Sequence, residues 1–308
     1  MAASATAPAP SPAEAHASST RPAPPPSVND LRIRVGTING SGSQSSNLVL
    51  LRALHHMGVP CSGKNIFPSN IEGLPTWFHL RASGAGYVGH RLDPQIIVCM
   101  HEPTAPDDVR SAIPGSIIIY REEFKEDLRG LRDDVRFLPV PFQKLADGAY
   151  PPDGTPAYRD KLRKVVNMVY VGTLAFACDL EMEGVEFGVR REFPGRKAKA
   201  AEVNLAAARA GYEWAAENWK GEEFPWKVRR ADLTGGQLLI DGNRAAGLGL
   251  VFGGATVLTW YPITPSSSLA EAAEHFLKAH RTAPDGERTF AVVQAEDELA
   301  AIGMVVGA

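Results

Sequence analysis

TWYPITPSSS, residues 259–268, sets the architecture of the C-terminal part of this chain together with QAEDELAA, residues 294–301. Residues 256–260 and 289–293, which come just before these motifs, are rich in apolar β-branched side chains and predict strands. A proline-bracketed turn with three serines follows the first strand, and a Glu/Asp-rich turn follows the second, as at helix starts. Two strand-to-helix junctions predict an α/β fold with a ligand site outside the carboxyl ends of its strands.

Length and composition limit the class of protein. With 308 residues, 44% of them hydrophobic, the chain can build two domains, each with its own core. A net charge of −3 argues against nucleic acid or an anionic membrane as a partner, and no apolar run approaches the length of a membrane span. Three widely spaced cysteines without a CxxC motif predict buried or half-buried free thiols, and exclude a disulfide framework and an iron–sulfur cluster held by this chain alone.

Residues 1–29 consist largely of Ala, Pro and Ser and predict a disordered tail, because they have little to bury against the entropy of ordering. The tail lacks the continuous apolar segment of a secretory signal, and its lone Arg21 argues against a transit peptide. The expected compartment is the cytoplasm.

Residues 31–57 predict a strand, a small-residue turn at 39–45 and a helix from 45 to 57. A dinucleotide-binding interpretation is weak, because Ser45 replaces the third glycine of GxGxxG and residues 39–64 contain no acidic residue to hold a ribose. The backbone N–H groups of this turn can hold an anion or a partner's loop, and packing alone is an equal alternative.

Further strands are predicted at residues 76–83, 95–100, 116–120 and 135–140, which favours a mostly parallel sheet. Residues 64–75 are expected to form an ordered recognition loop or a plain connection between strands. His101, at a strand end, suits a site or a hydrogen-bonded structural role. Helices are predicted at 158–179, 181–193 and 197–219, and the basic residues around Arg190 either meet an acidic ligand or form a solvated helix face.

These motifs resemble a known family. YPITPSS (261–267) and EDELAAIG (296–303), with Gly242-Asn243 before a small-residue helix, are similar to the start of the pyrimidine-binding thiamine diphosphate domain of 2-oxoacid:ferredoxin oxidoreductases. The match is best to the alpha subunit of the 2-oxoglutarate type, in which a gamma-like domain precedes the thiamine domain. GSGSQ (40–44) and FPSNIEG (67–73) resemble the gamma-domain motifs, although Asn70, Glu72 and Leu74 depart from the commoner SEIRGG form.

The resemblance implies an α/β architecture in which residues 30–228 form the gamma-like domain with a mostly parallel sheet and a helical C-terminal part. Residues 229–237 would be a linker, and 238–308 the first βα units of a doubly wound thiamine domain. About seventy residues are too few to close an independent parallel sheet. We therefore expect a fragment that binds thiamine diphosphate negligibly by itself.

The resemblance also assigns site residues. Glu296 is expected to be catalytic, because a carboxylate on ring nitrogen N1′ favours the imino form of the aminopyrimidine that removes the C2 proton. From the residues alone, Asp297 and Glu298 would suit a helix start equally well. Further residues are assigned to the cofactor (Tyr261, Pro262, Ile263, Thr264), to the substrate (Thr264, Pro265, Ser266), and to an active-site or interface loop (Ser69, Asn70, Glu72, Gly73).

The implied activity is oxidative decarboxylation of a 2-oxoacid, 2-oxoglutarate by the best match, with coenzyme A, giving an acyl-coenzyme A, CO2 and reduced ferredoxin. A beta subunit would share the thiamine diphosphate and hold the Mg²⁺ and the [4Fe-4S] cluster. The alternatives are a related enzyme for pyruvate or a branched-chain 2-oxoacid, and a non-catalytic gamma-like assembly or regulatory protein.

Overall fold

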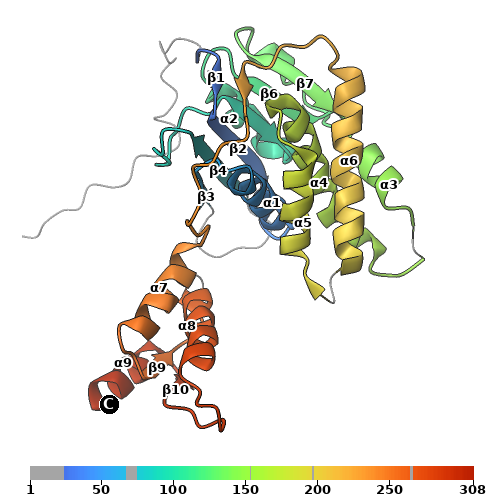
Figure 1. Ribbon diagram of the computed structural model, residues 1–308. Helices are drawn as coiled ribbons and strands as arrows, with labels where there is room; N and C mark the ends of the chain where they lie inside the picture. Colours follow the sequence, from blue (N-terminus) through green and yellow to red (C-terminus); the bar gives the residue numbers. More distant parts are fainter. Residues whose placement is uncertain (1–23, 67–74, 153, 196–197, 264–265) are drawn as a thin grey trace, which may run out of the picture. The chain divides into compact units, whose positions relative to one another are not determined.

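The computed structural model describes residues 24–66, 75–152, 154–195, 198–263 and 266–308. The chain divides into two compact units, one ending at Gln237 and one beginning at Leu238 (Figure 1). Within the described residues, none of the helices has the length and apolar character that crossing a bilayer requires.

The first unit contains a six-stranded sheet in the order β3-β4-β2-β5-β6-β7. Strands β2 (Asp30–Ile38), β5 (Ile96–Cys99), β6 (Ile117–Arg121) and β7 (Arg136–Val140) run parallel. Strands β3 (Cys61–Ile66) and β4 (Pro75–Ser83) add an antiparallel hairpin beside β2. The prediction of a mostly parallel α/β sheet is confirmed.

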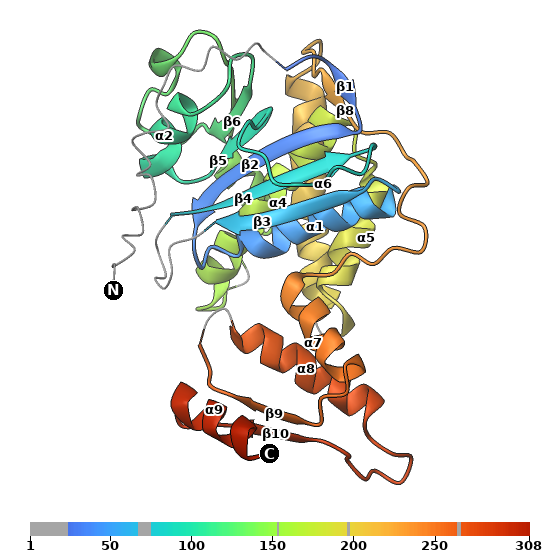
Figure 2. The same cartoon turned by 90° about the vertical axis from the view of Figure 1, so that its left-hand side faces the viewer.

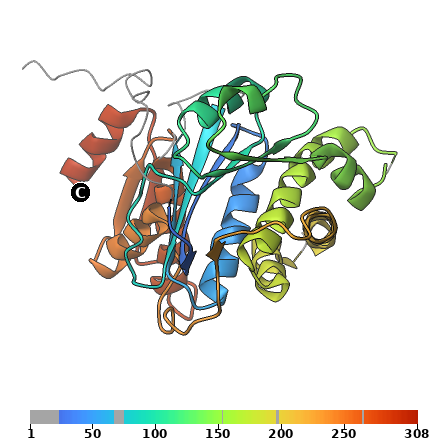
Figure 3. The ribbon, with the colours of Figure 1, turned by 90° about the horizontal axis from the view of Figure 1, so that it is seen from above.

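Successive side chains of β2 point to opposite faces of the sheet, and the two faces are covered differently. Leu31, Ile33 and Val35 are buried in the main core, on the side of α1 (Ser43–His56), α4 (Tyr158–Cys178), α5 (Met182–Glu192) and α6 (Ala198–Asn218) (Figures 2 and 3). On the other face, the short helix α2 (Ala105–Arg110) covers a smaller apolar cluster on β5 and β6. Helix α3 (Phe142–Ala149) follows β7.

The edge of the sheet and the end of the tail differ from their predictions. Residues 61–66 form edge strand β3 although residues from 64 onward were predicted to be a loop, because an exposed edge strand needs no apolar alternation. The end of the predicted tail is ordered: β1 (Ser27–Val28) pairs with β8 (Trp226–Lys227), and the buried Trp226 Nε1 donates to the Pro25 carbonyl oxygen at 3.1 Å. Residues 1–23 lie outside the described residues.

The predicted linker, residues 229–237, packs on the first unit. Ala231 N donates to Met57 O at 2.8 Å, and Thr234 Oγ1 donates to His55 O at 2.9 Å. These bonds hold the segment against the end of α1.

The second unit contains α7 (Gly242–Phe252), β9 (Val257–Trp260), α8 (Ser266–His280), β10 (Ala291–Gln294) and α9 (Glu298–Gly307). Strands β9 and β10 pair in parallel. Gly247 of α7 lets that helix approach Ala272 and Ala273 of α8 closely, since a Cβ there would lie 2.8 Å from the Ala273 nitrogen. Two βα junctions therefore exist in this unit, as its sequence motifs predicted.

Candidate functional site

The two C-terminal motifs meet at one edge of the small sheet. Parallel pairing places Gln294, the last residue of β10, opposite Trp260, the last residue of β9, and Ala295 N donates to Trp260 O at 2.7 Å. Tyr261 and Glu296 therefore leave the sheet at its carboxyl edge from neighbouring strands. This is the edge at which open α/β sheets bind ligands.

The acidic residues after β10 have different surroundings. Asp297 caps α9, its carboxylate Oδ1 accepting from Ala300 N at 2.6 Å, and the helix begins at Glu298. The expectation that Glu296 itself opens the helix is wrong, because the side chain of Asp297 satisfies the first-turn amide. Glu296 is exposed, and among the described residues its carboxylate has no hydrogen-bond or ion-pair partner. The carboxylate of Glu296, one residue before the capping Asp297, is therefore open to a ligand.

The turn after β9 is partly described. Tyr261 is half-buried, whereas Pro262, Ile263 and Ser266 are exposed. The Ile263 carbonyl oxygen accepts from Ser266 Oγ at 2.8 Å and from Ser267 N at 3.0 Å, so it ties the turn to the start of α8. The other predicted site positions lie outside the described residues: Ser69, Asn70, Glu72, Gly73, Thr264 and Pro265.

Asn243, at the start of α7, contacts the same region. Its Nδ2 donates to Ser268 Oγ at 2.6 Å. Asp241 caps α7 by accepting from Arg244 N. Asn243, the second residue of α7, is thus held next to Ser268, one of the serines that follow the proline-bracketed turn.

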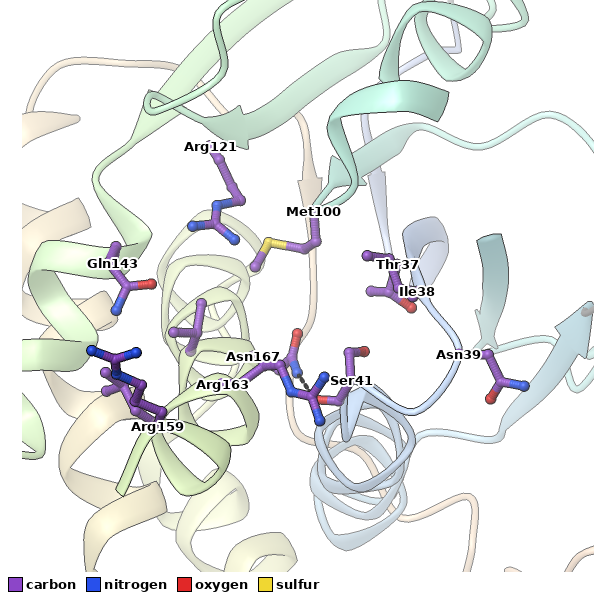
Figure 4. Close-up of a pocket in the computed structure, with 12 residues that line it drawn as sticks. Thr37, Ile38, Asn39, Ser41, Met100, Arg121, Gln143, Arg159, Arg163 and Asn167 are labelled. Atoms are coloured by element: carbon purple, nitrogen blue, oxygen red, sulfur yellow. Dashed lines mark hydrogen bonds between the residues drawn. The ribbon is translucent and has the colours of Figure 1, made fainter. Parts of the chain in front are cut away.

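The first unit contains a second candidate site, a cavity of about 320 Å³ (Figure 4). It lies at the carboxyl ends of three parallel strands, where Ile38 ends β2, Met100 follows β5 and Arg121 ends β6. Arg159 and Arg163 reach it from α4. A cavity with three guanidinium groups favours an anionic ligand.

Helix α4 also fixes the glycine turn that borders this cavity. Asn167 Nδ2 donates to Ser41 O at 2.8 Å (Figure 4), and buried Tyr170 donates through its hydroxyl to Asn47 Oδ1 at 2.9 Å. Burial raises the pKa of Tyr170 far above its usual range, so it remains a donor. Gly42 has φ 82°, a left-handed conformation that admits the tight turn into α1. The turn that leads into α1 therefore borders the cavity through Asn39 and Ser41.

Two other sequence candidates have structural roles. His101 Nδ1 lies 3.1 Å from Thr104 Oγ1, within hydrogen-bond distance, and burial lowers the pKa of its imidazole. Arg190 forms ion pairs with Glu186 and Glu202 at 2.8 and 2.9 Å, as a solvated helix face does.

The arginines of the cavity were not singled out in the sequence. Their signal was present, because Arg159, Arg163 and Asn167 follow one another at intervals of four and so share a face of α4. Arg121 comes from a distant strand. Among the described residues, no group of three metal-ligating side chains is placed to hold a metal ion.

Comparison with known proteins covers both units. The family model "Pyruvate ferredoxin/flavodoxin oxidoreductase" matches residues 32–214, and the thiamine diphosphate-binding model of the pyruvate flavodoxin/ferredoxin oxidoreductases matches residues 249–308. The chain is 23% identical over 320 residues to the alpha subunit of 2-oxoacid:ferredoxin oxidoreductase 2 of Aeropyrum pernix, a match covering 91% of this chain and 49% of that protein.

The 2-oxoacid:ferredoxin oxidoreductase alpha subunit of Saccharolobus solfataricus is 26% identical, and the match covers 89% of this chain and 47% of that protein. This chain thus spans about half the length of the curated relatives it matches. Its fold resembles a structure of 2-oxoglutarate:ferredoxin oxidoreductase from Magnetococcus marinus, with a TM-score of 0.72 and 24% identity over 91% of this chain and 45% of that one. The first family model matches well over half of the chain, and the chain therefore belongs to the pyruvate ferredoxin/flavodoxin oxidoreductase family.

Proposed function

We propose that this chain acts as an alpha-type subunit of a 2-oxoacid:ferredoxin oxidoreductase that converts 2-oxoglutarate and coenzyme A to an acyl-coenzyme A, CO2 and reduced ferredoxin. The observation that carries the proposal is the parallel pairing of β9 and β10, which brings Tyr261 and the open carboxylate of Glu296 to one sheet edge. The names of its relatives support the reaction class. The Magnetococcus structure, which contains 2-oxoglutarate, coenzyme A and succinyl-CoA, supports the substrates.

Thiamine diphosphate, when bound, supplies a C2 carbanion for the decarboxylation. The residues at the sheet edge fit its aminopyrimidine, because Glu296 offers an exposed carboxylate that is not engaged in capping α9. In our proposal this carboxylate accepts a hydrogen bond from the pyrimidine N1′ and holds the proton there. On the resemblance of the YPITPSS motif, we assign Tyr261, Pro262, Ile263 and Thr264 to the cofactor and Thr264, Pro265 and Ser266 to the substrate.

The cavity of the first unit fits the phosphate groups of coenzyme A. Arg121, Arg159 and Arg163 supply positive charge, and Asn39 and Ser41 of the glycine turn line the same cavity. A beta subunit is proposed to complete the thiamine diphosphate site and to hold Mg²⁺ and the [4Fe-4S] cluster. We place the cluster on that subunit because the three cysteines of this chain are widely spaced and form no CxxC motif.

The test is co-expression with a beta-type subunit of this family, followed by an assay of viologen or ferredoxin reduction. We expect reduction that requires coenzyme A and is fastest with 2-oxoglutarate among 2-oxoglutarate, pyruvate and a branched-chain 2-oxoacid. Faster reduction with another 2-oxoacid would change the assigned substrate. A stable complex that reduces no acceptor with any of the three acids would contradict the proposal and favour an assembly or regulatory role.

A further inference from the structure

Basic side chains gather on the sheet face that points away from α1. The strand register places Ser62, Arg81 and Arg32 in one row across β3, β4 and β2, and Lys64, His79 and Arg34 in the next row. Figure 2 shows these three strands side by side in front of α1. Like charges in directly opposite positions repel one another, so this arrangement requires compensation.

Three carboxylates compensate part of this charge. Asp93 pairs with Arg32 and Arg91 at 3.0 and 2.8 Å, and Asp30 pairs with Arg81. Asp108 lies 3.6 Å from Arg34. Within the described ranges Lys64 has no ion pair, and the Nε atoms of Arg32, Arg34 and Arg81 are buried without a hydrogen-bond partner.

A small pocket lies within this cluster. Its volume is about 10 Å³, which suits one water-sized particle and is too small for a phosphate ester. Its lining includes four basic side chains and two imidazoles: Arg32, Lys64, Arg81, Arg91, His79 and His90. It shares no lining residue with the 320 Å³ cavity.

Two histidines of the pocket lie close to each other and to its positive charges. His90 Nε2 lies 2.9 Å from His79 Nδ1, within hydrogen-bond distance. Burial, together with the charges of Arg34, His90 and Lys64, lowers the pKa of His79 to about 4. Burial and the charges of Lys64 and Arg34 also lower the pKa of His90. The same positive charges favour a negative particle in the pocket.

We propose that this pocket binds one monatomic anion of the halide class, held by Arg32, Lys64 and Arg81 on the face of the sheet opposite α1. The anion neutralises guanidinium charge that the three nearby carboxylates leave uncompensated, and so stabilises the hairpin β3–β4 against β2. The site is independent of the proposed catalytic function.

The test compares the full chain in sodium chloride and in sodium methanesulfonate at equal ionic strength. We expect a saturable rise in melting temperature with chloride alone, and a rise in the NMR-measured pKa of His79 as chloride binds. Lys64→Gln is expected to weaken chloride binding about tenfold, through loss of one adjacent charge. Lys220→Gln, which removes an exposed lysine that does not line the pocket, is expected to leave it unchanged.

Bromide crystallography of the wild-type protein gives a second measurement that does not depend on the folding of a variant. An anomalous peak within contact of Arg32, Lys64 and Arg81 supports the proposal. Equal melting temperatures in the two salts, unchanged chloride dependence in Lys64→Gln, or a pocket that holds only water in bromide would each overturn it.

Discussion

Asp108 carries a buried carboxylate where α2 packs on the sheet. Its Oδ1 accepts from Trp77 Nε1 at 2.9 Å, and Arg34 lies 3.6 Å away. Gly36 leaves room for the group, since a Cβ there would lie 2.6 Å from Asp108 Oδ2. Burial raises the pKa of Asp108 to about 6, and the hydrogen bond and charge of its neighbours offset only part of that effect.

Asp108→Asn should therefore change how stability depends on pH. The pKa of Asp108 is higher in the folded state than in the unfolded state, where it is about 4. Protonated Asp108 therefore contributes to stability, and this contribution is complete below pH 4 and is lost as the pH rises through 6. We expect the wild-type free energy of unfolding to fall relative to the variant between pH 4 and pH 7, measured by urea unfolding. Asp107→Asn, at an exposed neighbour, should show no such change. A difference for Asp108→Asn that is equal at every pH would contradict this account.

Arg163 provides a residue-level test of the larger cavity. If the cavity takes the phosphates of coenzyme A, Arg163→Gln should raise the KM for coenzyme A about tenfold by removing one charge-assisted contact. The kcat of the assembled enzyme should change little. The control is Arg191→Gln, at an exposed arginine of α5 that does not line the cavity. An unchanged KM in Arg163→Gln would place the phosphates elsewhere.

Among the secondary-structure elements, the long helices were predictable and the short pairings were not. The apolar run of residues 165–178 repeats over several turns, and the helix predicted at 158–179 is α4, Tyr158–Cys178. Strand β3 has no such pattern, and β1 depends on Trp226, about 200 residues further along the chain. Pairings of this kind are decided by distant partners rather than by local sequence.

The candidate sites show the same division. The edge formed by Tyr261 and Glu296 could be predicted because each motif includes its own strand end. The cavity could not, because Arg121 and Arg163 come from elements that only the folded sheet brings together. Predicting which acidic residue caps α9 also requires the backbone geometry, because Glu296, Asp297 and Glu298 are equivalent in sequence pattern.

The crossing of α4 and α6 depends on glycines. A Cβ on Gly172 of α4 would lie 1.8 Å from Ala208 O and 2.7 Å from Tyr212 N of α6. Gly172→Ala should therefore destabilise the first unit by at least about 1–3 kcal/mol, because two backbones must separate. Gly148→Ala is the matched control in α3, where a Cβ would meet nothing within 4 Å. Calorimetric unfolding that gives equal stabilities for the two variants would contradict this packing.

At the scale of the whole molecule, the two units differ in how well they bury their apolar residues. The first has an extensive core between its sheet and helices. The second has two strands among its described residues, and its helix α9 leaves Leu299 and Val306 78% and 82% exposed. Large exposed apolar side chains that lie together mark interaction surfaces. The catalysis that we propose for the second unit is accordingly to be tested in the assembled enzyme.

The most direct test of the proposed chemistry is the turnover of that assembled enzyme with Glu296→Gln, beside Glu298→Gln as the control. Both changes remove one exposed carboxylate from the same short segment, but only Glu296 is proposed to contact the cofactor. We predict that kcat with 2-oxoglutarate falls roughly 10²–10⁴-fold in Glu296→Gln and stays near wild type in Glu298→Gln. Wild-type turnover in Glu296→Gln, or an equal loss in both variants, would contradict the assignment.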